Sequence, residues 1–267
     1  MSERVDFWLG ASALLVACMP WWLSLLPLLL TFADDLLKNA VLQRSKGLMY
    51  VLCYTLSKAI QVSVWYVAKD ITDVSRVALG ALGIAVCVFH ICEFLCTAYF
   101  SPQALCIRGY HPFTHWTHWA VGLLAAAEWM GREAVPWDFK AVQSFCLFIG
   151  LILVVLGESW MVKARVDAGN RFLPKALTEQ DPQLVNTGAY AVCRHPWYFG
   201  WALWCIGLWV LVATPVTALC AAGLNAVALK RKIEVEELGL KQVIEEYRGY
   251  MAETQRLPRG LGWLAGV

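Results

Sequence analysis

The sequence contains few charged side chains for its length. Only 16% of its 267 residues are Asp, Glu, Lys or Arg, whereas 59% are hydrophobic. A soluble domain has roughly 25% charged and 45–50% apolar residues, so this balance excludes an ordinary soluble protein. The net charge is only +2, which argues against the basic surface that nucleic-acid binding requires, and we expect no nucleic-acid partner. These shortages indicate a protein that lies in a lipid bilayer.

The sequence also lacks the cysteine and histidine patterns of common metal sites. None of its 10 cysteines belongs to a C-x-x-C pair, so neither a structural zinc site nor a disulfide scaffold is indicated, and we interpret the cysteines as small buried hydrophobes. Five histidines are too few for a membrane di-iron oxidase. For His111, His115 and His118, which lie close together, we favour a loop before an interfacial helix over a metal site.

A cleavable signal peptide is not indicated at the N-terminus. The first apolar run, Phe7–Phe32, is longer than the usual 7–15-residue apolar core of a signal peptide, so we expect a retained membrane span. A membrane helix needs roughly 20 apolar residues. Besides that first run, the sequence offers the candidate spans Gly47–Val67, Val77–Phe100, Trp116–Met130 and Ala141–Gly157.

A long uncharged stretch, Trp197–Leu229, is sufficient for two short spans. Thr214 and Pro215 lie in its middle, where proline does not continue a regular helix, so the stretch predicts a helical hairpin. From Lys230 onward we expect a polar helix that ends near Glu253. The sequence therefore predicts an all-α polytopic membrane protein with about seven or eight transmembrane helices.

The distribution of Lys and Arg predicts the orientation of the chain. The segments on both sides of the hairpin are rich in cations, and the loop 34–46 carries further ones, so we place these segments in the cytosol. We predict three regions: N-terminal helices in 1–100, central helices in 101–162, and a catalytic region in 163–267 that includes the hairpin 197–229. The cations that flank the hairpin are Lys163, Arg165, Arg171, Lys175, Arg194, Lys230, Arg231 and Lys232.

The strongest candidate for a binding site is the segment Thr187–Gly200, which reads TGAYAVCRHPWYFG. It places Arg194 and His195 next to a membrane hairpin, where polar groups are costly unless they line a cavity or contact a ligand. An ordinary positive-inside anchor is the alternative explanation. The neighbouring tyrosines and glycines favour a site, because glycine permits close backbone approach and arginine can bind a carboxylate with both arms.

A second candidate lies in the tail. Five side chains spaced at i, i+4, i+7, i+11 and i+14 share one helical face, and a carboxylate with two tyrosines on an apolar face suggests packing over a polar pocket. These are Glu236, Leu240, Val243, Tyr247 and Tyr250.

Ionisable residues also occur within or at the end of apolar runs. His90 and Glu93 lie inside one predicted span, and Glu158 closes another. An ionisable group inside a span is a functional hypothesis by default, although Glu158 is also explained by an interfacial helix end.

Several separated blocks resemble the isoprenylcysteine carboxyl methyltransferase family. They are HICEFLCTAYF near residue 90, GESWMVKARVDAGNRF near residue 158, GAYAVCRHPWYFGWALWCIG from Gly188, KxxxEE at Lys232–Glu237, and EEYRGYM. The resemblance extends from about Phe89 to Gly260, and the blocks occur in the family's order.

The resemblance implies an endoplasmic-reticulum membrane enzyme with its active site facing the cytosol. Such an enzyme transfers a methyl group from S-adenosyl-L-methionine to the C-terminal carboxylate of a prenylated cysteine, on CaaX-derived proteins such as small GTPases. Carried over by position, the cofactor would contact Leu184, Val185, Tyr190, His195, Pro196, Trp197, Tyr198 and Glu236.

The cation that holds the substrate carboxylate is less well defined. The family's arginine in this role corresponds to Lys232, with Arg231 beside it, and lysine lacks arginine's planar fork. We expect Arg194 to bind the carboxylate, with Lys232 as the second choice. A C-terminal carboxylate has a pKa near 3.5 and is already a nucleophile at neutral pH, so no general base is required.

Two other classes share some of these features. The C-terminal blocks also resemble those of phospholipid methyltransferases and membrane sterol reductases. A non-enzymatic transporter or scaffold is the other alternative, but the chain shows no evident internal repeat, and its polar groups gather at one face instead of the membrane midplane.

Overall fold

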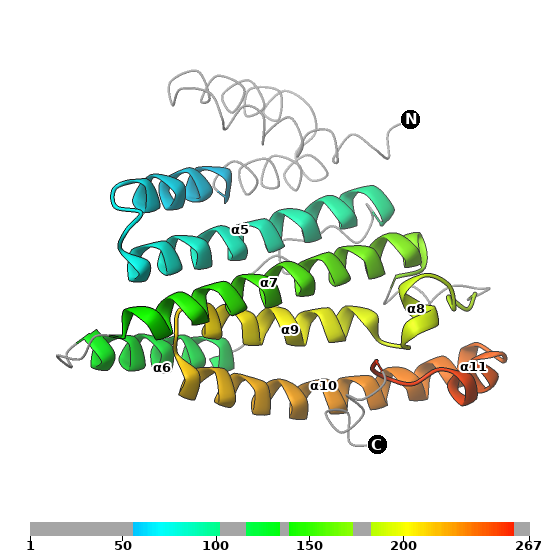
Figure 1. Cartoon of the computed structure of the whole chain (residues 1–267). Helices are drawn as coiled ribbons and strands as arrows, with labels where there is room; N and C mark the ends of the chain where they lie inside the picture. The colour runs from blue at the N-terminus through cyan, green and yellow to red at the C-terminus, as the bar shows by residue number, and fades with distance from the viewer. Residues whose placement is uncertain (1–55, 102–115, 134–138, 173–182, 259–267) are drawn as a thin grey trace, which may run out of the picture. The chain divides into compact units, whose positions relative to one another are not determined.

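The computed structural model describes residues 56–101, 116–133, 139–172 and 183–258, and the ordered elements in these ranges are helices (Figure 1). The chain divides into two compact units, Met1–His118 and Trp119–Val267. The predicted spans at Phe7–Phe32 and in the first part of Gly47–Val67 lie outside the described residues, as do His111 and His115. The predicted three-region division stays a prediction.

In the first unit, a helical segment at 56–68 is followed by α5 (Val74–Phe100). Asp73 caps α5, because its carboxylate accepts a hydrogen bond from the backbone N–H of Arg76 at 3.2 Å. Gly83 lets the two helices approach, since a Cβ there would lie 2.6 Å from Ser63 Oγ. The prediction of a long apolar helix through Glu93 to Phe100 is confirmed.

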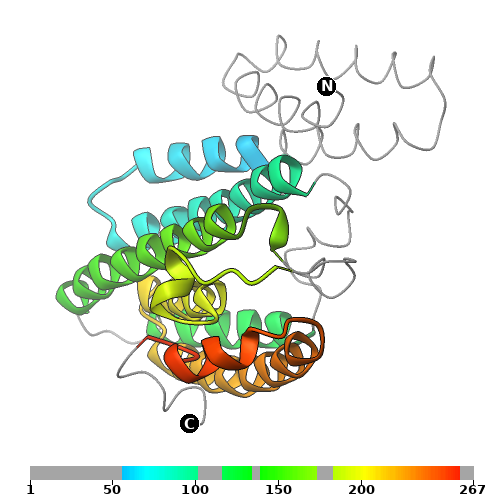
Figure 2. The same ribbon diagram turned by 90° about the vertical axis from the view of Figure 1, so that its right-hand side faces the viewer.

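The second unit contains α6 (Trp116–Glu133), α7 (Lys140–Ala168), the short 3-10 helix η4 (Gly169–Arg171), α8 (Ala189–Val192), α9 (Pro196–Leu211), α10 (Pro215–Val243) and α11 (Tyr247–Glu253). Figures 1 and 2 show α7 and α9 side by side, with α10 packed along α9.

Four glycines lie at the contact between α7 and α9, and a Cβ on the first of them, Gly150, would lie 2.4 Å from backbone atoms of Leu211. A Cβ on Gly157 would lie 2.6 Å from the carbonyl oxygen of Gly200, and a Cβ on Gly207 would lie 2.8 Å from the backbone nitrogen of Val154. Gly157 thus pairs with Gly200, whereas the earlier residue Val154 pairs with the later residue Gly207, so the two helices are antiparallel. Membrane helices often pack through such small residues, because backbone contact replaces the missing hydrophobic driving force.

The predicted hairpin at Trp197–Leu229 is confirmed, and α6 stabilises its turn. Glu128 accepts hydrogen bonds from the backbone N–H groups of Val216 (3.0 Å) and Thr217 (2.9 Å), which are free donors at the start of α10. Arg132 donates to the carbonyl oxygens of Val212 and Ala213, both at 2.9 Å. One helix therefore caps both helix ends at the turn, which the sequence did not indicate.

Two predicted helix boundaries were wrong. α7 does not end near Glu158 but continues to Ala168, because Met161, Ala164 and Arg165 remain buried on its inner face. It ends at Gly169, which adopts a φ of 57°. The tail is also not one separate polar helix: α10 passes without a break from the apolar run through Lys230 to Val243, and α11 follows after a turn.

The described helices include two that are long and apolar enough to span a membrane, Val74–Phe100 and Lys140–Arg171. Pro196–Leu211 is apolar but shorter. The predicted total of seven or eight spans stays a prediction. Large apolar side chains along α7, such as Phe145 at 66% exposure and Phe148 at 62%, face outward as they do in a lipid-facing helix.

We predict that Gly157→Ala destabilises the protein, because the new methyl group would collide with backbone atoms of α9. Overpacking of this kind costs roughly 1–3 kcal/mol. Gly223→Ala is the matched control, since a Cβ there meets nothing within 4 Å. The melting temperature in detergent micelles should fall for Gly157→Ala and stay level or rise for Gly223→Ala. Equal melting temperatures would contradict the proposed role of the glycine contact.

Candidate functional site

The start of α9 and the C-terminal third of α10 bring His195 and two adjacent glutamates together. Pro196 is the first residue of α9, where its missing N–H costs no helical hydrogen bond, and His195 precedes it as the N-cap. Glu236 and Glu237 lie on the part of α10 that extends beyond its apolar half. Residues some 40 positions apart in the sequence are thus held side by side.

Glu237 is the most completely buried charged group of the cluster, with 1% exposure. Nε and Nη2 of Arg194 each lie 2.9 Å from its Oε1. On the other side, Arg256 Nε and Nη2 lie 3.0 and 2.9 Å from its Oε2. His195 Nε2 adds a contact of 3.2 Å to Oε1. A buried carboxylate is tolerated only when it is paired in this way.

These contacts determine the protonation of Glu237. Burial raises the pKa of its carboxyl group. The hydrogen bonds from His195 and Arg256 and the charge of Arg194 lower the pKa by more than burial raises it, to about 2. Glu237 is therefore ionised at any physiological pH and acts as the permanent counter-ion of two arginines.

The segment that ends α11 and follows it is fastened to the same point. The backbone N–H of Arg194 donates to the carbonyl oxygen of Gln255 at 2.8 Å, and that of His195 donates to the carbonyl oxygen of Arg256 at 3.2 Å. Arg194 Nη1 donates to the carbonyl oxygens of Met251 (3.1 Å) and Thr254. The tail that follows α11 therefore folds back along Arg194–His195 and supplies Arg256 to Glu237.

Glu236 points to the other side of His195, towards a pocket. Its Oε2 accepts a hydrogen bond from Tyr198 Oη at 2.8 Å, and its Oε1 lies 3.8 Å from His195 Nδ1. Burial raises the pKa of its carboxyl group above the usual value, against the opposing effects of His195, Tyr198 and Lys232. Two adjacent glutamates thus have opposite electrostatic environments.

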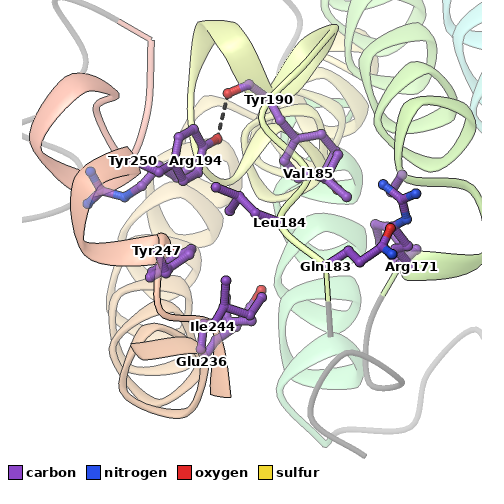
Figure 3. Close-up of a pocket in the computed structure, with 13 residues that line it drawn as sticks. Arg171, Gln183, Leu184, Val185, Tyr190, Arg194, Glu236, Ile244, Tyr247 and Tyr250 are labelled. Carbon is purple, nitrogen blue, oxygen red and sulfur yellow. Dashed lines mark hydrogen bonds between the residues drawn. The ribbon is translucent and has the colours of Figure 1, made fainter. Parts of the chain in front are cut away.

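The pocket is shown in Figure 3 and has an empty volume of about 500 Å³, part of it open to solvent. Arg171 and Gln183 lie on one side of it, and Tyr247 and Tyr250 on the opposite side. Its lining residues are Ala168, Arg171, Phe172, Gln183, Leu184, Val185, Tyr190, Arg194, Glu236, Leu240, Ile244, Tyr247 and Tyr250.

Three tyrosines give the pocket an aromatic wall. Tyr250 Oη donates to the carbonyl oxygen of Tyr190 at 2.5 Å and so fastens α11 to α8. Tyr247 is 3% exposed, and within the described part of the chain its Oη has no hydrogen-bond partner. Burial raises the pKa of the Tyr190 and Tyr247 phenols, so both are neutral at pH 7. A buried hydroxyl without a partner at a pocket wall is suited to bind a polar group of a ligand.

Half of the residues predicted to contact a cofactor line this pocket. Leu184, Val185, Tyr190 and Glu236 do so. The other four do not line it. His195 and Pro196 are buried, and Tyr198 donates a hydrogen bond to Glu236. The ring of Trp197 lies edge to face on that of Phe172, with 6.3 Å between the ring centres.

Four of the five residues predicted to share one face of a tail helix lie on the same side, although a turn separates α10 from α11. Glu236, Leu240, Tyr247 and Tyr250 face the pocket, whereas Val243 is 40% exposed. Sequence reasoning did not assign Glu237, Arg256 or Arg171 to the site. The doublet at Glu236–Glu237 was a visible signal for the first of these, but nothing in the spacing indicated that Arg256 returns to it.

The predicted substrate-binding cations are in different environments. The guanidinium of Arg194 contacts Glu237 and two backbone carbonyls, so the fork that we expected to bind a substrate is occupied within the protein. Lys232 is exposed, and its Nζ lies 5.6 Å from the centre of the Tyr198 ring. Arg231 is exposed as well. This geometry favours Lys232 for the contact with a substrate.

The other ionisable groups singled out in the sequence lie elsewhere. His90 is buried in α5 and stacks edge to face on Phe89. Glu93 and Glu158 are half-buried on α5 and α7. Among the described residues no group of three or more His, Cys, Asp or Glu side chains is arranged to hold a metal ion.

Together, the apolar helices, the hairpin and the polar pocket at its end indicate a helical membrane protein with a candidate ligand site. The family model for isoprenylcysteine carboxyl methyltransferase (ICMT) matches residues 149–242. These residues include α9, most of α10 and both glutamates. The chain belongs to the isoprenylcysteine carboxyl methyltransferase family.

Individual relatives support this assignment. A mouse protein-S-isoprenylcysteine O-methyltransferase is 31% identical over 183 residues, covering 67% of this chain and 63% of the mouse protein. The Arabidopsis thaliana protein-S-isoprenylcysteine O-methyltransferase B is 28% identical over 190 residues, covering 68% of this chain and 92% of that protein. The match thus spans somewhat less than two thirds of the mouse relative. These names favour a methyltransferase of this class over a phospholipid methyltransferase, a sterol reductase or a transporter.

The fold is also found in a solved structure. The eukaryotic intramembrane Ras methyltransferase ICMT superposes with a TM-score of 0.74, over 97% of this chain and 93% of that chain, at 20% sequence identity. At this identity the similarity establishes the all-α membrane fold.

We predict that Glu237→Gln destabilises the protein, because it leaves two arginines without their buried counter-ion. Breaking a buried ion pair from one side costs roughly 3–5 kcal/mol. Glu236→Gln should melt close to the parent protein. Thermal unfolding in detergent compares the two variants, with the exposed Glu253→Gln as a control for charge alone. Equal melting temperatures for both doublet variants would contradict the assignment.

The same carboxylate predicts an acid-sensitive stability. Its folded pKa of about 2 lies below the value of 4.5 that is usual for a glutamate side chain in the unfolded chain. Its contribution to stability is therefore complete above pH 4.5 and is lost as the pH falls towards 2. The parent protein should therefore lose melting temperature across this range more steeply than Glu237→Gln. Parallel pH profiles would contradict the pKa assignment.

Proposed function

We propose that this protein transfers a methyl group from S-adenosyl-L-methionine to the C-terminal carboxylate of a prenylated cysteine. The observation that carries the proposal is the pocket of Figure 3, in which the Glu236 carboxylate, 12% exposed, and three tyrosines lie at the end of a membrane hairpin within the family fold. The relatives' names supply the reaction class.

The pocket residues fit S-adenosylmethionine. When bound, this cofactor supplies a methyl group made electrophilic by a sulfonium cation. Cations are attracted by tyrosine ring faces and by carboxylates, and Glu236 with Tyr190 and Tyr247 offers both. Leu184 and Val185 provide apolar contact for a nucleoside. The unpartnered Tyr247 Oη can bind one of the ligand's polar groups. His195, Pro196, Trp197 and Tyr198 would act from behind, by holding Glu236 and the pocket wall.

The residues around the pocket have three tasks in this reaction. A terminal carboxylate is already ionised near pH 7, so no residue has to remove a proton. The protein must instead orient the carboxylate towards the methyl group, exclude water and offset the cost of desolvation with a cation. The prenyl chain would remain in the bilayer beside the hairpin, where each buried CH₂ contributes about 0.8 kcal/mol.

We assign the substrate carboxylate to Lys232 and give Arg194 a positioning role. Lys232 is exposed beside Tyr198, which holds Glu236, so its ammonium group is close to the pocket and accessible from solvent. Arg194 could bind a substrate only by releasing Glu237. Arg231 precedes Lys232 on α10, is also exposed, and would add positive charge to the same part of the helix.

The membrane and its sidedness belong to the same proposal. The substrates would be CaaX-derived prenylated protein C-termini, for example on small GTPases, which are already anchored in a membrane. We propose an endoplasmic-reticulum location with the tail and the pocket facing the cytosol, because the cations flanking the hairpin favour that side. The catalytic region then corresponds to residues 163–267.

The direct test is methyl transfer by the purified full-length protein. We predict that it methylates a farnesylated cysteine analogue with labelled S-adenosylmethionine, and that a truncation after Arg231 is inactive because it removes both glutamates, Tyr247, Tyr250 and Arg256. His195→Ala should weaken S-adenosylmethionine binding by about tenfold or more, since Glu236 loses its neighbour. An inactive parent protein that binds NADPH would instead favour the reductase alternative.

Kinetics distinguish the two cations. We predict that Lys232→Ala lowers kcat/KM for the prenylcysteine by at least about tenfold, with S-adenosylhomocysteine affinity nearly unchanged. Lys241→Ala, on the same helix outside the pocket, is the matched control and should behave like the parent. Arg194→Ala should instead lower the melting temperature. If Arg194→Ala stays folded and alone shows the substrate defect, the two roles are reversed.

A further inference from the structure

Glu236 has an unusual position among the charged groups of the site. Both arginines of the cluster are bound to Glu237, so Glu236 is left with a tyrosine, one face of an imidazole and the more distant charge of Lys232. The side chain of Glu236 is only 12% exposed. Among the described residues no Lys or Arg forms a salt bridge with Glu236. A carboxylate that is nearly removed from water without such a partner is poorly stabilised in its ionised form.

His195 lies between the two carboxylates. Its Nε2 is 3.2 Å from Glu237 Oε1 and its Nδ1 is 3.8 Å from Glu236 Oε1. Because Glu237 is ionised, Nε2 must carry a hydrogen and donate it. In the neutral tautomer Nδ1 then presents a lone pair to Glu236, which would repel an ionised carboxylate. The arrangement is favourable only when one additional proton lies on Nδ1 or on Glu236.

We propose that the His195–Glu236 pair holds one proton in the ligand-free protein and releases it when a cationic ligand enters the pocket. Glu236 would then determine the charge selectivity of the site: it favours a sulfonium cation over the neutral thioether that remains after methyl transfer. This inference rests on the proposed function, because it concerns the cofactor pocket of that reaction.

The charge balance follows from the neighbours of Glu236. Without a ligand, the protonated pair is electrically neutral if the proton lies on Glu236 and forms an ion pair if it lies on His195. A cation in the pocket replaces that proton as the partner of the carboxylate, and the proton leaves to solvent. Among the described residues, the charged and titratable groups that interact with Glu236 are His195 just before α9, Tyr198 from α9, Tyr190 from α8, Lys232 and Glu237 from α10, and Tyr247 from α11.

Two measurable consequences follow. Since binding of a cation releases a proton, its affinity should increase with pH by up to about tenfold per pH unit while the free pair holds its proton, and should level off once the free pair has lost it. A neutral ligand gains nothing from the ionised carboxylate, so its affinity should be nearly independent of pH. After methyl transfer the pair takes up its proton again, which weakens the attraction to the product and favours its release.

Calorimetry of the full-length protein in detergent tests the proposal. S-adenosylmethionine and S-adenosylhomocysteine are titrated separately from about pH 5 to about pH 8, in buffers that differ in ionisation enthalpy, so that the number of protons released is measured directly. We expect release of up to one proton with S-adenosylmethionine and none with S-adenosylhomocysteine. In Glu236→Gln the preference for S-adenosylmethionine should fall by about tenfold and the proton release should disappear.

Glu234→Gln is the matched control, because it removes the same charge from the same helix at a residue that does not line the pocket. It should retain both the preference and the proton release. If both ligands bind the parent protein with equal pH dependence and without proton release, the inference is overturned while the proposed function stands. If neither ligand binds, the proposed cofactor is wrong, and the inference fails with it.

Discussion

The site depends on a single buried carboxylate. Glu237 is 1% exposed and is held by Arg194, Arg256 and His195. Arg194 and His195 come from the segment before α9, and Arg256 comes from the segment after α11. One side chain of α10 therefore joins these two segments to its own helix. Because a buried charge is costly unless all its partners are present, these parts are stable only together.

That constraint explains why the pocket has its shape. Once Arg194 and Arg256 are bound to Glu237, the tail must run along Arg194–His195, and the backbone hydrogen bonds to Gln255 and Arg256 follow. α11 is then held where Tyr250 can reach the carbonyl oxygen of Tyr190. The aromatic wall of the pocket is therefore a consequence of an ion-pair network that lies behind it.

The remaining framework brings that network to the end of a membrane hairpin. Gly157, Gly200 and Gly207 let α7 and α9 pack with their backbones in contact, and Glu128 and Arg132 of α6 cap the turn between α9 and α10. The two adjacent glutamates then have different roles: Glu237 is a permanent structural anion, and Glu236 faces the pocket. The same residue type acquires two roles because two arginines reach only one of them.

The sequence by itself determined the all-α membrane class and the hairpin with its turn near Thr214–Pro215. It also singled out the segments around His195 and Glu236 as candidate sites. Such features are local: apolar run length, proline position and helical spacing are properties of neighbouring residues. It also placed Tyr247 and Tyr250 on the face of Glu236, although a turn at 244–246 interrupts the helix between them. Only the tertiary structure decided that α7 extends to Ala168, that Arg256 returns to Glu237, and that Arg194 is occupied within the protein. Such contacts join residues that the chain separates by 19 and 43 positions, and the partner of a buried charge depends on packing that no local pattern records.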